Sequence, residues 1–158
     1  MNEIEDLFRR HPFAAGLDDE IIAFIAGCAS NAVFPAGSYL FREGAAADRF
    51  YLIRHGTVAV ETYLPGHGAM TVLTVKDGEL LGASWLIPPY RYAFDGRAVE
   101  LTRVLAFNAK CLREKAEADH HVGYELMKRF IPPLIARLQI ARLQALDCDG
   151  VAAVTADD

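Results

Sequence analysis

The residues with the clearest chemical potential lie in one stretch, DGELLGASWLIPPYRYAFDGRA, which covers residues 77–98. Its GASW run, residues 82–85, can form a tight turn that opens a short helix, and the first N–H groups of a helix have no partner inside it. Such groups bind anions, and the guanidinium of Arg91 can supply a matching charge because it forks onto phosphate oxygens. The stretch therefore indicates an anion-binding cradle built on Gly82 and Arg91. The alternative is an ordinary loop beside a Pro-Pro turn.

Aromatic side chains are concentrated in the same stretch, around Pro88 and Pro89. Large aromatic rings can fill a pocket from within, or they can stack on a planar ligand. Filling is the simpler interpretation, and stacking stays open as the alternative. The four side chains concerned are Trp85, Tyr90, Tyr92 and Phe94.

Histidine, cysteine and acidic residues do not form the groupings that metal or nucleophilic catalysis requires. An enzyme of the small β-roll type needs His ligands on adjoining strands, whereas His55 and His67 are isolated at turns. His121 and Glu125 can share a helical face, but two ligands do not make a metal site, and we interpret them as a solvated pair. No nucleophile can be argued from the spacing. The cysteines form no CxxC pair and suit a reducing compartment; they are Cys28, Cys111 and Cys148. We expect no enzyme activity and no metal.

Charge and hydropathy exclude two classes of partner. The net charge of −5 and the pI near 5.5 argue against direct DNA binding, which needs a concentrated Lys/Arg surface. The N-terminus has acidic residues where a signal peptide needs a basic start, and the apolar stretches are too short to cross a bilayer. The chain is thus predicted to be cytoplasmic. We interpret four cationic residues near the C-terminus as solvent-facing charge: Lys128, Arg129, Arg137 and Arg142.

The elements that must position the cradle are short strands separated by glycines. Gly37, Gly44 and Gly56 separate short apolar runs, a pattern typical of an antiparallel β-roll. We predict the roll to cover residues 31–108. The expected strands are 39–41, 50–53, a hairpin of 57–63 with 70–75, and a final pair at 97–101 and 103–107.

Helices are predicted on both sides of the roll, which makes the fold class mixed α+β. The N-terminal helices fall within residues 1–30, at 4–10 and 17–29, where an apolar stripe follows acidic residues in the first turn. Helix formers then fill residues 109–148, and residues 149–158 are predicted to be a flexible tail. Pro132 and Pro133 are expected to interrupt or kink the second C-terminal helix.

Apolar residues of this second helix recur at alternating intervals of three and four, the spacing of a coiled-coil seam. The seam predicts a two-fold homodimer along the helix, and the alternative is that the stripe docks on its own roll. The seam residues are Tyr124, Met127, Ile131, Leu134, Leu138 and Ala141, and the same spacing continues through Ala145 and Cys148.

Taken together, the stretch from Phe34 to Phe107 resembles the cyclic-nucleotide-binding domain of the Crp/Fnr regulator superfamily. The fragments FPAGSYLFREGAAADRFYLIRHGTVAV and DGELLG match that family in order and spacing, and similarity extends over roughly residues 10–146. The resemblance implies a jelly-roll-like β-roll, cAMP or cGMP as the ligand, and a bacterial stand-alone member. Regulators of this family continue into a winged helix-turn-helix domain, whereas this chain stops at Asp158.

In the family, an Arg binds the cyclic phosphate, a Glu binds the ribose 2′-hydroxyl, and the C-terminal helix closes over the base. The family's phosphate cassette, the segment that carries these residues, corresponds here to residues 82–93. Gly82 takes the place of its glycine, but Ala83 stands where the Glu would be. The phosphate Arg corresponds to Arg91, or to Tyr92 if the register is counted back from Ala98. Losing the carboxylate removes about 1.5–3 kcal/mol, or about ten- to a hundredfold in affinity. The implied ligand-binding set is Gly82, Ala83, Ser84, Trp85, Arg91, Tyr92 and Ala93.

Two hypotheses about function follow. In the first, the chain is a non-enzymatic sensor that binds a phosphate ligand and signals through its C-terminal helix to a partner protein. In the second, Trp85 and the tyrosines plug the pocket, and the chain is a ligand-independent dimeric scaffold.

Overall fold

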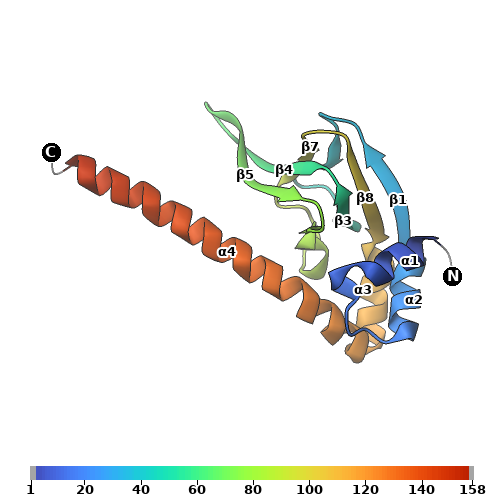
Figure 1. The fold of residues 1–158 in the computed structure, drawn as a ribbon. Helices are drawn as coiled ribbons and strands as arrows, with labels where there is room; N and C mark the ends of the chain where they lie inside the picture. The colour runs from blue at the N-terminus through green and yellow to red at the C-terminus, as the bar shows by residue number, and fades with distance from the viewer. Residues whose placement is uncertain (1–2, 157–158) are drawn as a thin grey trace.

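Two antiparallel sheets form the β-roll that the sequence predicts (Figure 1). The computed structural model describes residues 3–156, and the side chains of residues 3–146. Within that part, one four-stranded sheet has the order β1-β8-β3-β6 and the other has the order β2-β7-β4-β5. The strands are β1 (Ala29–Phe34), β2 (Tyr39–Phe41), β3 (Arg49–His55), β4 (Thr57–Leu64), β5 (Gly68–Lys76), β6 (Leu80–Leu81), β7 (Asp95–Ala98) and β8 (Thr102–Asn108).

The predicted hairpin is confirmed, since β4 pairs with β5 from Thr57↔Lys76 to Leu64↔Gly68. The turn between β3 and β4 requires glycine: Gly56 has φ +129°, and a Cβ there would lie 2.5 Å from the hydroxyl oxygen of Thr102. Strand β1 is missing from the sequence-based prediction, which extended the preceding helix to Ala29. It pairs along its whole length with β8.

Short helices close one end of the roll. They are α1 (Glu3–Arg10), the 3₁₀ helix η1 (Pro12–Ala14), α2 (Asp19–Gly27) and α3 (Ala109–Ala118). Figure 1 shows α1, α2 and α3 gathered beside the ends of β1 and β8. A second 3₁₀ helix, η2 (Ala83–Leu86), follows β6. One continuous core contains buried side chains from both sheets and these helices, including Phe8, Phe13, Phe50, Trp85 and Phe107.

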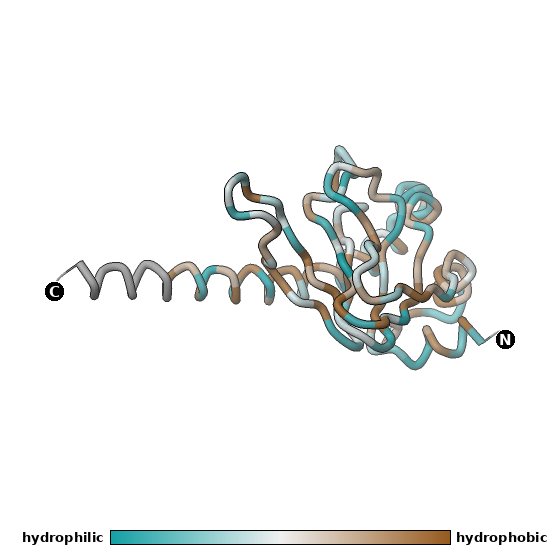
Figure 2. Tube along the Cα trace, turned by 90° about the horizontal axis from the view of Figure 1, so that it is seen from above, coloured by the Kyte–Doolittle hydropathy of each residue, from teal (hydrophilic) through white to brown (hydrophobic). Residues whose placement is uncertain are grey.

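Among the residues whose side chains are described, the last helix, α4 (His120–Ala156), buries apolar side chains in the core only in its first part. Val122, Leu126 and Phe130 recur every four residues and are buried, so they form one face of the helix against the core. Beyond them α4 extends away from the roll, and its turns carry both hydrophobic and hydrophilic residues (Figures 1 and 2).

Two predictions about this helix need correction. Pro132 and Pro133 do not interrupt α4, which is continuous across them. The φ of proline is itself helical, so a helix with strong formers on both sides can pass through at the cost of lost hydrogen bonds. The break falls instead at Asp119, between α3 and α4. Residues 149–156, predicted to be a flexible tail, belong to α4, while 157–158 lie outside the described residues.

Candidate ligand-binding site

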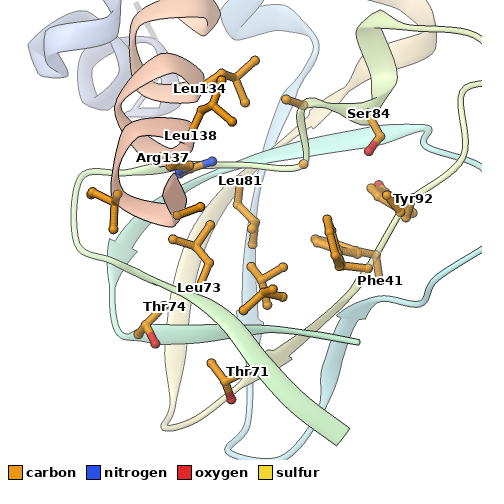
Figure 3. Close-up of a pocket in the computed structure, with 18 of the residues that line it drawn as sticks. Phe41, Thr71, Leu73, Thr74, Leu81, Ser84, Tyr92, Leu134, Arg137 and Leu138 are labelled. Carbon is orange, nitrogen blue, oxygen red and sulfur yellow. The ribbon is translucent and has the colours of Figure 1, made fainter. Parts of the chain in front are cut away.

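A cavity of about 720 Å³ lies between the roll, the segment around η2 and the underside of α4 (Figure 3). This volume lies within the range of small-molecule sites, and most of the lining is apolar, as in such sites. The sheet contributes Phe41, Val60, Thr71, Val72, Leu73 and Thr74; the segment after β5 contributes Leu81, Gly82, Ala83, Ser84, Tyr92, Ala93 and Phe94; and α4 contributes Leu134, Arg137, Leu138, Ile140, Ala141 and Gln144.

Gly82 turns the chain from β6 into η2 and thereby places the first residues of the cassette on the cavity wall. Its φ of +95° favours glycine, and a Cβ would lie 3.3 Å from the carbonyl oxygen of Arg49. Ala83 and Ser84 follow as the first residues of the short helix, and both line the cavity. The predicted turn that opens a helix is therefore present, and Gly82, Ala83 and Ser84 lie together.

Trp85 points away from the cavity into the core. Its side chain is fully buried, stacks on Phe50 with ring centroids 5.2 Å apart, and meets Phe130 of α4 edge-on at 5.5 Å. Trp85 is not among the lining residues, so it neither plugs the cavity nor offers a face to a ligand. Its role in the structure is to join η2, β3 and α4.

Tyr92 lines the cavity opposite α4 (Figure 3). Its ring stacks on Phe41 at 4.2 Å, and its hydroxyl donates to the carbonyl oxygen of Arg49 at 2.6 Å. Ala93 and Phe94 line the cavity beside it. Burial raises the pKa of Tyr92, because the phenolate loses more hydration than the neutral phenol.

Arg91 lies outside this cavity. The guanidinium is exposed and donates from Nη1 to the carbonyl oxygen of Gly44 at 2.8 Å, while its backbone forms an isolated bridge with Ala46. Gly82 and Arg91 thus do not face a common hollow in this structure. Tyr92, which takes the phosphate position in the alternative register, does line the cavity, whereas Arg91 does not.

Two arginines interpreted from the sequence as solvent-facing charge are instead held against the protein. Arg137 lines the cavity from α4 and donates to the carbonyl oxygen of Leu80, and burial lowers its pKa. Arg129 donates to the carbonyl oxygens of Phe13 and Ala15. The apolar residues Phe130, next to Arg129, and Leu134, one turn before Arg137, are the sequence signal that this side of the helix contacts the roll.

The predicted seam of α4 contains exposed residues. Tyr124 is 62% exposed, Met127 50%, Ile131 48% and Leu138 69%. Leu134, Leu138 and Ala141 also line the cavity, so the outer part of the seam lies next to it.

The described residues contain no cluster of three or more His, Cys, Asp and Glu side chains that could hold a metal. Glu125, considered as a partner of His121, instead receives a hydrogen bond from Arg129 at 2.5 Å, which lowers its pKa. His121 lies 3.3 Å from a carboxylate oxygen of Asp18. None of the helices in the described part combines the length and apolarity that a bilayer crossing needs.

Tyr92→Phe is expected to lower the free energy of unfolding by about 1–2 kcal/mol at neutral pH, because the carbonyl of Arg49 loses its donor. It should also flatten the alkaline loss of stability. The raised pKa of Tyr92 means that the unfolded chain ionises first, so its contribution is complete below about pH 10 and is lost as the pH rises beyond. Urea unfolding at neutral and alkaline pH measures both effects. An unchanged alkaline slope would contradict the assignment, although burial also raises the pKa of Tyr51, so part of the slope remains in the variant.

Comparison with known proteins agrees with this architecture. Residues 32–119 match the family described as the cyclic nucleotide-binding domain. A putative cyclic nucleotide-binding protein from Geobacter metallireducens GS-15 is 35% identical, with a TM-score of 0.76, over 87% of this chain and 99% of that one. The N-terminal domain of a transcriptional regulator from Streptomyces coelicolor A3(2) is 27% identical, with a TM-score of 0.64, over 89% and 95%.

A third structure shares the fold. The regulatory subunit of a cAMP-independent protein kinase A from Trypanosoma cruzi, bound to guanosine, is 22% identical, with a TM-score of 0.61, over 69% of this chain and 38% of that one. A search among curated proteins found no significant match.

Proposed function

We propose that this chain, which belongs to the cyclic nucleotide-binding domain family, is a non-enzymatic sensor module that binds a small ligand beneath α4 and signals through that helix to a partner protein. The family is typically regulatory. The observation that carries the proposal is the shared lining of the cavity, since Gly82–Ser84 and α4 residues from Leu134 to Gln144 bound one hollow. A ligand there would touch the cassette and the helix together, so its binding energy can bias the position of α4.

The chemistry of the lining favours a planar, largely apolar ligand over a tightly held cyclic phosphate. Arg137 is the one cationic residue among those that line the cavity, and its guanidinium already donates to the carbonyl oxygen of Leu80. Tyr92 and Phe41 present stacked aromatic rings on the opposite side (Figure 3). We therefore expect cAMP and cGMP to bind weakly. Nucleosides such as guanosine should bind with comparable affinity, because the phosphate group contributes little to binding in this cavity.

Isothermal titration with cAMP, cGMP and guanosine, up to millimolar concentration, tests the proposal. At least one of the three should give saturable heat. Ala141→Trp fills the cavity from α4 and should abolish that heat, whereas Leu143→Trp, an exposed position that does not line the cavity, should preserve it. Absence of heat with all three compounds would contradict the proposed ligand class.

Ala83→Glu is expected to tighten cAMP binding by about ten- to a hundredfold, because it restores an acceptor for the ribose hydroxyl. Ala83 lines the cavity and is only partly buried, so the new carboxylate has space and access to water. Ala83→Gln is the matched control, since it has the same shape without the charge and should gain less. Equal affinities for the wild type and the Glu variant would show that the ribose does not lie against η2.

A second candidate, a dimeric scaffold, is favoured by the exposed apolar seam of α4. Ile131→Glu places a charge at its centre, where a two-fold partner helix would bury it, and should convert a dimer to a monomer. Gln139→Glu adds the same charge at an exposed position outside the seam and should leave the dimer intact. Light scattering coupled to size-exclusion chromatography measures the mass, and a wild-type monomer would exclude this candidate.

A further inference from the structure

Two thiols that are distant in sequence lie side by side. The Sγ atoms of Cys28 and Cys111 are 3.4 Å apart, within the distance of an S–H hydrogen bond, and both residues are only partly buried. Cys28 follows the last residue of α2, and Cys111 lies in the first turn of α3. They lie outside the ligand cavity, and no step of the proposed function uses them.

The backbone fixes this proximity. Strand β1 pairs with β8 from Ala29↔Phe107, so the residues just before and after that pair, Cys28 and Asn108, meet at the end of the ladder. The N–H of Asn108 donates to the carbonyl oxygen of Cys28 at 2.8 Å. The side chain of Asn108 then caps α3 by accepting from the N–H of Cys111 at 3.1 Å. Sheet register and helix cap together bring the two sulfur atoms to the same place.

We propose that Cys28 and Cys111 form a reversible dithiol/disulfide pair that is oxidised by hydrogen peroxide or a related peroxide. A disulfide needs the sulfur atoms at about 2.05 Å, so they must approach by roughly 1.4 Å, which rotation about the Cα–Cβ bonds and a small shift of the first turn of α3 can supply. The bond would join the start of β1 to α3, and the loop of chain that it closes, residues 28–111, would contain both sheets.

The reaction begins at Cys111. Burial, followed by the hydrogen bond to Cys111, raises the pKa of Cys28 to about 12, so Cys28 is a protonated thiol at neutral pH and a poor first nucleophile. The sulfur of Cys111 gives up its proton and attacks one peroxide oxygen. The O–O bond breaks, a sulfenic acid forms, and the departing hydroxide takes up the proton and leaves as water. The sulfur of Cys28 then attacks the Cys111 sulfur, loses its proton and displaces the hydroxyl as a second water. Two thiols are oxidised to one disulfide while one peroxide is reduced.

Helix α3, which carries Cys111, also contacts the cassette, so the disulfide can affect the proposed ligand site. Arg113, two residues after Cys111, donates from Nη1 to the carbonyl oxygen of Trp85 in η2 at 2.8 Å, and its guanidinium lies 4.1 Å from the ring centroid of Tyr90. A disulfide that fixes the first turn of α3 therefore also restrains η2.

Peroxide treatment of the full chain carrying Cys148→Ser tests the proposal, because that background leaves only the two thiols in question. Both thiols should disappear, the intact mass should fall by two hydrogen atoms, and peptide mapping should find Cys28 joined to Cys111. The melting temperature should rise by at least about 5 °C, since the bond closes a long loop of the unfolded chain, and dithiothreitol should reverse every change. Hydrogen exchange in α3 and η2 should slow in the oxidised form.

The variant Cys28→Ser/Cys148→Ser keeps Cys111 alone and separates a pair from a single reactive thiol. It should gain oxygen at Cys111 or form a dimer between two chains, without the rise in melting temperature. The proposal is overturned if the two-cysteine protein gains oxygen atoms instead of losing hydrogen, or if both thiols survive peroxide while the fold is intact by circular dichroism. None of these outcomes depends on whether a nucleotide or nucleoside binds.

Discussion

Trp85→Ala is expected to lower the free energy of unfolding by about 4 kcal/mol and to release α4 from the roll. The indole is fully buried where three segments meet, stacked on Phe50 of β3 and against Phe130 of α4. Removing it leaves a cavity at this junction that no single segment can fill by moving. Because Phe130 is the last buried residue of α4 among those described, the helix beyond it has the least remaining attachment.

Circular dichroism in urea measures the loss of unfolding free energy. Fluorescence cannot be used, since Trp85 is the only tryptophan and its replacement removes the intrinsic tryptophan fluorescence. Hydrogen exchange along α4 reports the release. Trp85→Phe should cost much less, because the indole Nε1 has no hydrogen-bond partner within the described structure and a phenyl ring keeps most of the stacking. Ile87→Ala, two residues on and 67% exposed, is the surface control. A loss no larger than that of the control would contradict the central role of Trp85.

Much of the fold could be predicted because its signals are local. Glycines that need positive φ, such as Gly37, Gly44 and Gly56, mark the corners of the roll whatever surrounds them. Strand β1 was not predictable in this way. Its sequence, ASNAVF, is short and contains the polar residues Ser30 and Asn31, and it is a strand because β8 supplies hydrogen-bond partners from far along the chain. The continuity of α4 through Pro132 and Pro133 is likewise decided by the helix on both sides rather than by the prolines.

The candidate site could be predicted only in part, for the same reason. Gly82 was recognisable because its conformation is a property of one residue, whereas Tyr92, which lines the cavity, was only the alternative to Arg91 in the family register. The direction of a long side chain is set by distant neighbours instead. Arg91 donates to Gly44, and Arg137 crosses to Leu80 from a helix that the sequence alone left free to face solvent.

A second anchor of α4 lies one residue before Phe130. The side chain of Arg129 is 12% exposed and reaches from α4 to the turn after α1, where Nε donates to the carbonyl oxygen of Phe13 and Nη2 to that of Ala15, both at 2.6 Å. Nη1 donates to Glu125 on the same helix at 2.5 Å. One guanidinium therefore satisfies two backbone carbonyls of the N-terminal segment and a carboxylate of its own helix, and it ties the start of α4 to the N-terminal segment.

Arg129→Ala is expected to lower the free energy of unfolding by about 3 kcal/mol, because it leaves these acceptors without their charged donor. Arg129→Lys should recover only part of the loss, since an ammonium cannot fork to two carbonyls in a fixed geometry. Lys128→Ala, at the exposed neighbouring position, should have little effect. Urea unfolding gives the three values, and an Arg129→Ala variant as stable as Lys128→Ala would contradict the anchoring role of the guanidinium. Since the ligand cavity begins one turn later, at Leu134, the loosened helix should also bind any cavity ligand more weakly, with the greater loss in the alanine variant.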